Sequence, residues 1–525
     1  MVKRIEMPDP DTCYKMFKAH DARFDGRFFV GVATTGIYCR AVCTAKTPKR
    51  DSCSFFPTAA AAEAAGFRPC LKCRPELAPG TPASIDAKNL ARQAADQIRS
   101  APGSFSGVGR IADNLGVSER HLRRLFEDEY GVTPAQYRNT CRLLLAKGLL
   151  TETDLPISRI AFICGFSSTR RFNDAFLKSY RMNPRHFRRD VKDAALAHEA
   201  NGNPAGSASP ARKDASSGNS AGSMRATKDA APIAIHIGYR APFAYGSLVR
   251  FLSLRSIAGV EAVNSGTYRR TARIRHEDGS ASCGWFAVFN EPAHSSLRVV
   301  VSPQLAEDLP YVLSRVRMIF DTDCLPDAIR EGLGSFFEAA PTVPPIDGVR
   351  LPGCFDGFEM ACRAILGQQI TVKAASTLAG RMAAELGEPI DTPFDDLRFL
   401  FPTPQRMLEP DAAEALGRIG VIHSRQEAII GLARAICEGK VALVPGADLA
   451  QQSEQLLALK GIGPWTVQYL LMRAYTYPDA FPAADYAVKN AFPDRLPREV
   501  EDLSQAWRPW RSYAVMTLWQ TAATE

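Results

Sequence analysis

The chain has 525 residues, of which 46% are hydrophobic and 23% charged, and its formal net charge is +8. This length exceeds what one hydrophobic core can serve, so several domains are expected, each large enough to exclude water from a site. No apolar run approaches the roughly 18 residues that a membrane span needs, which argues for a soluble protein. The first residues lack the charged-then-apolar order of a secretion signal, so a cytoplasmic location with reduced cysteines is expected.

The positive charge is concentrated in the front of the chain. Residues 1–190 hold 31 lysines and arginines against 19 aspartates and glutamates, a net of +12, whereas the remainder holds 33 against 37, a net of −4. A basic front half favours a polyanionic partner such as DNA, because phosphate contacts release counterions. On charge alone, a solubilising surface explains the excess equally well.

Residues 1–78 predict a small α+β domain with little core, which a covalent or metal staple would help to fold. Four of its cysteines form two close pairs, separated internally by three and two residues and from each other by 26: Cys39 with Cys43, and Cys70 with Cys73. Close pairs let one turn present two thiolates to the same ion, so the spacing predicts a closed tetrahedral zinc site. The alternative is four unrelated thiols. Cys53, between the pairs, is interpreted as a buried thiol.

The segments Thr34–Cys43 and Gly66–Cys73 closely resemble the amino-terminal domain of the Ada-type adaptive-response proteins, over nearly the whole of this domain. The resemblance implies that the four cysteines hold zinc and that Cys39 irreversibly accepts a methyl group from a DNA methylphosphotriester. It also implies DNA contacts by Thr35 and Arg68. Four thiolates around Zn²⁺ carry a net charge of −2, so methylating Cys39 would remove one negative charge and raise the affinity for DNA.

Residues 85–190 predict an all-α domain with two helix-turn-helix units, because its motifs recur at an offset of 49 or 50 residues. In the first unit a glycine turn precedes a helix capped by Ser118; in the second, Ser167 or Ser168 takes that place. Polar residues on the outer faces of the two second helices suit a DNA major groove: Arg120, His121, Arg123 and Arg124, then Arg170, Arg171 and Asn173. Solvated basic helices are the alternative.

These two units resemble the AraC-type DNA-binding domain, including the closing segment Asn183–Arg188. The resemblance implies a transcription regulator with double-stranded DNA as its partner and, if it activates transcription, RNA polymerase as well. Together with the zinc domain it matches the regulatory half of the Ada-type proteins. No Pro-Cys-His-Arg motif occurs in the chain, so O6-methylguanine methyltransferase activity is not predicted.

Residues 191–231 have almost no large apolar side chains and many Gly, Ser, Asn and Ala residues. Such a segment cannot bury enough surface to offset its ordering entropy, so it predicts a flexible linker. We therefore expect the two halves that it joins to move independently.

The back half predicts an α+β domain over 232–340 and an all-α domain over 341–525. The first contains the strand-like runs Gly284–Phe289 and Leu297–Val301, whereas the second is dominated by helical patterns punctuated by Gly and Pro.

The segment Leu459–Thr466, with Gly461 and Gly463, predicts a hairpin between two helices. Its glycines let backbone amides approach a phosphate, and the following helix adds its positive end. Asp485 lies 22 residues beyond Gly463. Taken alone, an aspartate in this setting is more often a helix cap than a catalytic group.

Residues 232–520 resemble the AlkA-type 3-methyladenine DNA glycosylases of the helix-hairpin-helix superfamily. Ordered matches carry the resemblance: Leu351–Cys354, Ala364–Gln369, Phe401–Gln405, the hairpin, Asp485 and Trp510–Ala514. It implies that Asp485 is the catalytic aspartate and that Gln369 stands where some relatives place a leucine wedge. It also implies an aromatic base pocket, made by Trp465, Tyr469, Tyr486 and Trp519.

The expected chemistry suits these residues. Alkylation at N3 of adenine or N7 of guanine makes the base a cationic leaving group, so a carboxylate at Asp485 suffices to stabilise an oxocarbenium-like sugar. Aromatic faces attract the electron-poor base, although ordinary core packing is the alternative for those rings. Relatives that also cleave the strand carry a lysine where Trp465 stands, so a monofunctional glycosylase is predicted.

The sequence thus predicts a DNA-3-methyladenine glycosylase II-type repair enzyme fused to a methylphosphotriester sensor and transcription regulator. The competing hypothesis is a transcription regulator whose glycosylase domain binds lesions without turnover. A monomer is expected, and the resemblance makes a monovalent cation at the hairpin a candidate second ligand.

Overall fold

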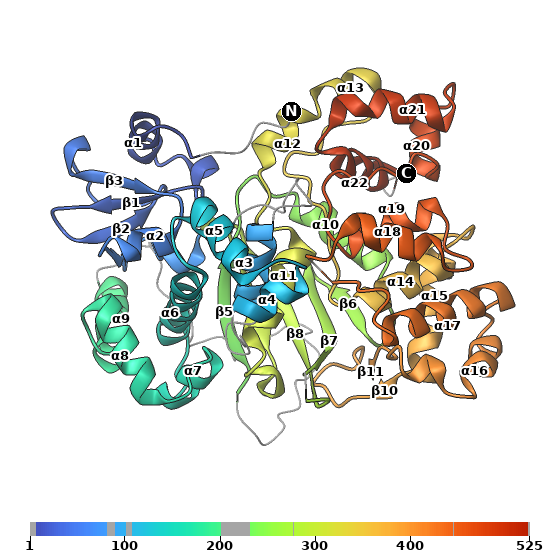
Figure 1. Ribbon diagram of the computed structural model, residues 1–525, viewed down its shortest axis with the longest axis horizontal. Coiled ribbons are helices and arrows are strands. Elements are labelled where there is room, and N and C mark those ends of the chain that lie inside the picture. The colour runs from blue at the N-terminus through green and yellow to red at the C-terminus, as the bar shows by residue number, and fades with distance from the viewer. Residues whose placement is uncertain are drawn as a thin grey trace.

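The computed structural model describes residues 7–80, 90–100, 108–200, 231–276, 278–444 and 446–522, without the side chains of 114 and 194–200. A five-stranded sheet lies near the middle of the molecule in Figure 1, with residues 7–80 and 134–200 on its left, the helices of residues 357–522 on its right, and residues 90–100 and 108–130 drawn in front of it. In the described part of the chain, no helix has the length and apolarity needed to cross a bilayer.

The first domain is built on a four-stranded sheet in the order β3-β1-β2-β4. The central strand β1 pairs antiparallel with β2 and β3, and β2 pairs parallel with the short β4. The strands and helices are β1 (Phe29–Val32), β2 (Ile37–Arg40), β3 (Cys53–Phe56), β4 (Arg68–Pro69), α1 (Pro10–Lys18) and α2 (Ala59–Ala64). The register sets Tyr38 of β2 opposite Pro69 of β4, so the residues that follow, Cys39 and Cys70, are neighbours.

The second domain is all-α, as predicted, and contains two helix-turn-helix units joined by the long helix α6. Ser118 caps α5 and Ser168 caps α8, each accepting a bond from the backbone three residues on. These caps confirm the predicted starts of both helices. The helices are α3 (Leu90–Ser100), α4 (Val108–Asn114), α5 (Glu119–Tyr130), α6 (Pro134–Glu152), α7 (Ile157–Ile163), α8 (Thr169–Tyr180) and α9 (Pro184–Ala200).

Helix α9 continues to Ala200, ten residues past the predicted domain end at 190. The greater part of the predicted linker, residues 201–230, lies outside the described residues.

The third domain is an antiparallel sheet in the order β5-β9-β8-β7-β6, covered by helices. The two strand-like runs noted in the sequence lie in β8 and β9, which confirms the predicted strands. The elements are β5 (Ile233–Gly238), β6 (Glu261–Asn264), β7 (Thr267–Arg275), β8 (Ala281–Glu291), β9 (Ser296–Val301), α10 (Tyr245–Leu254), α11 (Leu309–Phe320), α12 (Pro326–Gly332) and α13 (Gly334–Ala339).

The last domain is helical, with one small ribbon of two-residue strands, β10 (Glu388–Pro389) and β11 (Phe399–Leu400). Gly461, at φ +86°, turns the chain between α18 and α19, where the hairpin was predicted. The helices are α14 (Gly357–Leu366), α15 (Val372–Leu386), α16 (Ala412–Arg418), α17 (His423–Cys437), α18 (Leu449–Leu457), α19 (Pro464–Arg473), α20 (Tyr486–Ala491), α21 (Pro497–Leu503) and α22 (Arg511–Ala522).

The expectation that the two halves move independently is not met in this structure. One buried apolar cluster runs from Leu143 and Leu149 of α6 to Ile235 of β5 and on into the last domain. Glu152 of α6 also accepts a hydrogen bond from the backbone N–H of His236 in β5 (2.8 Å). The linker composition indicates how freely the linker itself moves, but it carries no information on whether the domains at its ends pack together.

Candidate functional site

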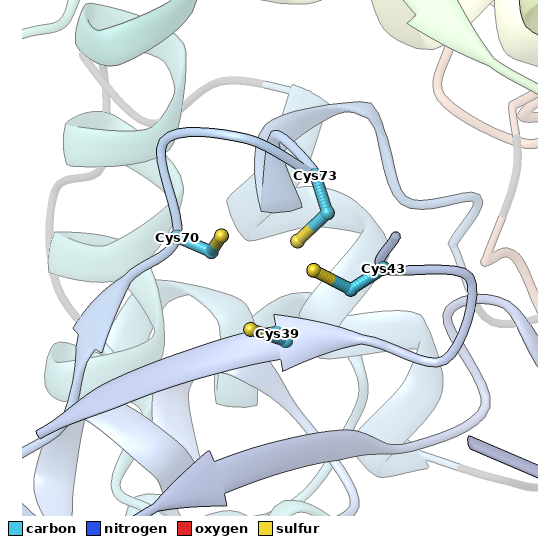
Figure 2. Close-up of side chains that lie close together, drawn as sticks. All are labelled: Cys39, Cys43, Cys70 and Cys73. Atoms are coloured by element: carbon cyan, nitrogen blue, oxygen red, sulfur yellow. The ribbon is translucent and has the colours of Figure 1, made fainter. Parts of the chain in front are cut away.

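The four predicted cysteines converge on one point at the edge of the first sheet (Figure 2). Their sulfur atoms all lie within 4.8 Å of one another. Tetrahedral zinc–thiolate bonds of 2.3 Å place sulfurs about 3.8 Å apart, so these residues fit a zinc ion in both donor chemistry and spacing. Cys39, Cys43 and Cys70 are buried and Cys73 is partly exposed. Cys53 is buried outside the cluster, with its Sγ 3.4 Å from the Lys49 carbonyl, as predicted.

The chain around the cluster is held by Arg40, which follows Cys39 in β2. The backbone N–H of Arg40 donates to the Cys73 Sγ (3.3 Å), and its guanidinium donates to the Cys73 carbonyl (3.0 Å). The same guanidinium pairs with the buried carboxylate of Asp25. Thr35 is exposed in the turn before β2, and Arg68 begins β4 opposite Ile37. Both predicted DNA-contact residues therefore lie at one end of the sheet that carries Cys39.

The two predicted recognition helices present their basic residues outward. On α5, Arg120, Arg123 and Arg124 are exposed and His121 is partly exposed, while Leu122 and Phe126 are buried. On α8, the predicted contact residues Arg170, Arg171 and Asn173 are all exposed.

In the last domain, Asp485 is 7% exposed and lies between two tryptophans. The Trp465 indole donates to Oδ2 (2.9 Å) and the Trp519 indole donates to Oδ1 (2.9 Å). Asp485 is also the N-cap of α20, since Oδ1 accepts from the Ala487 backbone N–H (2.9 Å). The structure therefore confirms the helix cap, and the catalytic role of the same carboxylate stays a prediction.

Three of the four predicted pocket rings form a continuous group beside that carboxylate. Trp465 and Tyr469, one helical turn apart on α19, are stacked with centroids 5.2 Å apart, and Tyr469 contacts Trp519 of α22 at 5.7 Å. Tyr486 lies apart from them. It follows the cap on α20, is 76% exposed, and makes no ring contact within the described residues.

The structure adds two residues that the sequence interpretation missed. Phe251 of α10 stacks on Trp519, with centroids 6.1 Å apart at 13°. The guanidinium of Arg255 lies 3.8 Å from the centre of the Phe251 ring, and burial lowers the pKa of Arg255 to about 10. These residues precede Asp485 by about 230 positions, in an amphipathic helix whose local pattern carries no chemical signal.

The hairpin and the predicted wedge face the same region of the last domain. Gly463 is the N-cap of α19, with Pro464 in its first turn, so the helix begins directly after the hairpin. Gln369 is exposed in the turn between α14 and α15 and has the left-handed backbone conformation, φ +57°.

Four family models match the chain in order, and together they span most of it. They are the metal binding domain of Ada (residues 12–76), a helix-turn-helix domain (111–190), the AlkA N-terminal domain (234–356) and the HhH-GPD superfamily base excision DNA repair protein (362–496).

One group of similar proteins matches nearly the whole chain, and others match only part of it. The probable bifunctional transcriptional activator/DNA repair enzyme AlkA of Mycobacterium tuberculosis is 34% identical over 517 residues, which cover 98% of this chain and 96% of that protein. DNA-3-methyladenine glycosylase 2 of Escherichia coli is 33% identical over 54% of this chain and 96% of its own length. The bifunctional activator Ada of Escherichia coli is 33% identical over 29% of this chain and 44% of its own length.

The chain therefore belongs to the family of bifunctional AlkA-type transcriptional activators and DNA repair enzymes, in which an Ada-type zinc-binding domain and a helix-turn-helix domain precede a helix-hairpin-helix DNA glycosylase.

Proposed function

We propose that the last domain is a monofunctional glycosylase that hydrolyses the N-glycosidic bond of alkylated bases such as 3-methyladenine and 7-methylguanine, with Asp485 as its catalytic residue. The observation that carries the proposal is the Asp485 carboxylate held between the Trp465 and Trp519 indoles at the edge of an aromatic group. A flipped alkylated base stacks against those rings, where its positive charge is stabilised by about 1 kcal/mol per contact.

In this mechanism the bond between the sugar C1′ and the base nitrogen breaks, and the electron pair leaves with the cationic base. Asp485 stabilises the positive charge that develops on the sugar and orients the attacking water, whose oxygen bonds to C1′ and whose proton is released. The products are the free base and an abasic site. The position next to the carboxylate is an indole, Trp465, which cannot form the Schiff base needed for strand cleavage.

The decisive experiment compares base release from alkylated duplex DNA by the full-length protein and by Asp485→Asn. The variant is expected to lose at least a hundredfold in single-turnover rate while it still binds duplex DNA, because the amide cannot stabilise the sugar cation. Asp448→Asn, which changes another helix-capping aspartate, is the matched control and should leave the rate unchanged. An unchanged rate for Asp485→Asn would overturn the catalytic assignment of Asp485. No base release by the wild-type protein would instead favour the competing view of a lesion-binding regulator without turnover.

We further propose that Cys39 accepts a methyl group from a DNA methylphosphotriester. In this proposal Cys39, Cys43, Cys70 and Cys73 together hold a zinc ion. Bound zinc would keep the four sulfurs deprotonated and therefore nucleophilic. The Cys39 sulfur forms a bond to the methyl carbon, the bond from that carbon to the phosphotriester oxygen breaks, and a phosphodiester anion leaves. The methylated sulfur has one negative charge fewer, which favours DNA binding by the front half and hence its regulatory role.

Mass spectrometry of peptides after exposure to methylphosphotriester DNA should show one added methyl group, on Cys39. Cys39→Ser should carry none, and Cys53→Ser, which changes a buried thiol outside the cluster, should be methylated as the wild type is. Methylation at Cys43 would overturn this assignment.

The remaining proposals concern partners and boundaries. The exposed basic faces of α5 and α8 support promoter binding. If the front half activates transcription, it would also contact RNA polymerase. The protein is proposed to act as a monomer. The hairpin around Gly461 is proposed to hold a monovalent cation through backbone carbonyls. The proposed domain limits are 1–78, 85–190, 232–340 and 341–525, and the order of the family matches supports them.

A further inference from the structure

The turn between α14 and α15, here called the wedge turn, carries the predicted wedge Gln369. The residue before it, Gln368, ties this turn to the hairpin. The side-chain amide of Gln368 donates to the Gly461 carbonyl in the hairpin (2.9 Å) and to the Thr466 hydroxyl (3.1 Å). Thr466 is 2% exposed and follows Trp465 directly in α19. One amide group therefore spans the wedge turn, the hairpin and the first turn of the helix that carries Trp465.

Helix α17 contacts both the wedge turn and the hairpin. Arg425 donates from its guanidinium to the backbone carbonyl of Gln368, which fixes the turn. Glu427 pairs with Lys460 of the hairpin (2.9 Å), and Gly461 packs so close to Ala428 that a Cβ at Gly461 would lie 2.8 Å from the Ala428 Cβ. Three positions within four residues of α17 therefore hold the wedge turn and the hairpin in one fixed relation.

The fixed positions of the wedge turn and the hairpin matter for base flipping. A hairpin that grips the backbone phosphate and a wedge that enters the base stack must act on the same nucleotide at a set distance. Gln369 is polar and fills a gap less well than an apolar side chain, so its placement matters more. Its left-handed backbone, φ +57°, also needs support from neighbouring contacts, because that conformation is disfavoured for a residue with a side chain.

We propose that Gln368 is a positioning residue for base flipping: it couples the wedge at Gln369 to the hairpin, so that gripping the phosphate and opening the base pair occur in register. The proposal rests on the glycosylase function proposed above. Gln368 does not touch the reacting atoms; it acts through Gln369 and through the hairpin. Two N–H donors at this position are required, because the partners are a carbonyl and a hydroxyl that both accept.

The test uses Gln368→Met in the full-length protein, which keeps the side-chain length and removes both donors. Duplex DNA carries one 7-methylguanine, paired with cytosine or placed opposite a mismatched thymine, and single-turnover base release is measured for each. We expect the variant to be about tenfold slower on the paired lesion and within about twofold of wild type on the mismatch, since a weakly paired base flips easily. Equal losses on both duplexes would overturn the proposal, because a merely structural defect does not depend on the opposite base.

Helix α17 offers a matched control. Gln426 of α17 donates its amide to the Val421 carbonyl, away from the wedge turn, so Gln426→Met should release base from both duplexes as the wild type does. If Gln368→Met does not fold, Arg425→Gln tests the same turn through its other bond and should show the same dependence on the opposite base. The double variant Gln368→Met/Gln369→Ala should be no slower than Gln369→Ala alone; additive losses would contradict action through the wedge.

The outcome also separates this proposal from the proposed function. If the wild-type protein releases no base from either duplex, the glycosylase assignment fails. If it releases base and Gln368→Met matches it on the paired lesion, only the positioning role fails.

Discussion

The carboxylate of Asp485 accepts hydrogen bonds from both tryptophans whose rings border the proposed base pocket. An indole has one donor, and here that donor is directed at the carboxylate rather than at a base. The edges of the two rings are therefore engaged with Asp485, which leaves for the proposed base stacking only the ring faces that Tyr469 and Phe251 do not cover. Because each oxygen of the carboxylate has an indole partner, the group is oriented before any substrate arrives, which is the arrangement that electrostatic stabilisation of a transition state requires.

Replacing Trp519 with phenylalanine keeps an aromatic ring and removes one of these donors. A hydrogen bond to a charged group contributes about 1.5–3 kcal/mol, so single-turnover base release should fall by roughly 10- to 100-fold. Trp285→Phe is the matched control, because Trp285 is also buried, 6% exposed in β8, and packs against Phe394. This substitution should leave the rate unchanged. Equal losses in the two variants would show that general destabilisation, and not the missing donor, is measured.

At this scale the sequence located the carboxylate but not its full surroundings. Asp485, Trp465 and Tyr469 could be predicted because they lie close together in the chain and in an ordered set of motifs. Phe251 and Arg255 could not, since the contact of Phe251 with Trp519 is created by the packing of α10 against α22, and Arg255 in turn lies over the Phe251 ring. The exposure of Tyr486 depends on how far α20 turns after its cap, which neither composition nor spacing reveals.

The carboxylate of Glu63 in α2 is one of the groups that join the zinc-binding domain to helix α6 of the helix-turn-helix domain. Glu63 of α2 accepts hydrogen bonds from the hydroxyls of Thr140 in α6 (2.8 Å) and Tyr38 in β2 (3.0 Å). Tyr38 immediately precedes Cys39, so this contact lies beside the cysteine cluster. No cation of the described residues forms an ion pair with Glu63, and burial raises the pKa of this carboxyl to about 7.

The contact between α2 and α6 should therefore weaken as the pH rises. The pKa of Glu63 is about 7 in the folded protein and 4.5 without the fold, so the folded state binds the proton more tightly. Its stabilising contribution is complete below pH 4.5 and is lost as the pH rises to 7, by about 2–3 kcal/mol. Glu63→Gln should raise the urea midpoint above that of the wild type at pH 8 and match it at pH 5.

Urea unfolding followed by circular dichroism at both pH values measures this difference. Glu414→Gln, which changes an exposed glutamate of α16, should shift neither midpoint appreciably. A shift for Glu63→Gln of the same size at pH 5 and pH 8 would contradict the titration and indicate lost hydrogen bonds instead.

Elements with local signals were predictable, and the contacts between them were not. The caps at Ser118 and Ser168 and the strands β8 and β9 follow from patterns a few residues long. The contact of Glu63 with Thr140 joins positions 77 apart, and an isolated glutamate in an alanine-rich helix is most simply interpreted as a solvent-facing residue.

In the whole molecule, the regulator half and the glycosylase half share buried polar contacts as well as a common apolar cluster. Arg240, which follows β5, is 2% exposed and donates to the carbonyls of Asp25, Gly80, Asp323 and Cys324. Asp323 in turn accepts from the Gly80 backbone N–H (2.8 Å) and pairs with Arg99 of α3 and Arg317 of α11, each at 3.2 Å. Contacts between residues more than 200 positions apart leave no trace in composition or periodicity.

These contacts form a short connection from the cysteine cluster to the sheet of the glycosylase half. Cys73 accepts from Arg40, Arg40 pairs with Asp25, and the Asp25 carbonyl accepts from Arg240 (2.9 Å). A second connection runs from Arg74, next to Cys73, to Glu152, which also binds His236 in β5. Loosening the cluster should therefore loosen β5, because the strand loses one partner at His236 and another just beyond its end, at Arg240.

Hydrogen exchange can test this dependence without any measurement of activity. In the wild-type protein, removing zinc with a chelator should speed amide exchange in peptides from β5 and α11, since their partners in the first domain become disordered. In Arg240→Met the same peptides should exchange faster even before chelation, and chelation should add less. Arg330→Met, which removes an exposed arginine of α12, should behave as the wild type does. If chelation leaves β5 and α11 of the wild type unchanged, the two halves are packed together but not energetically coupled.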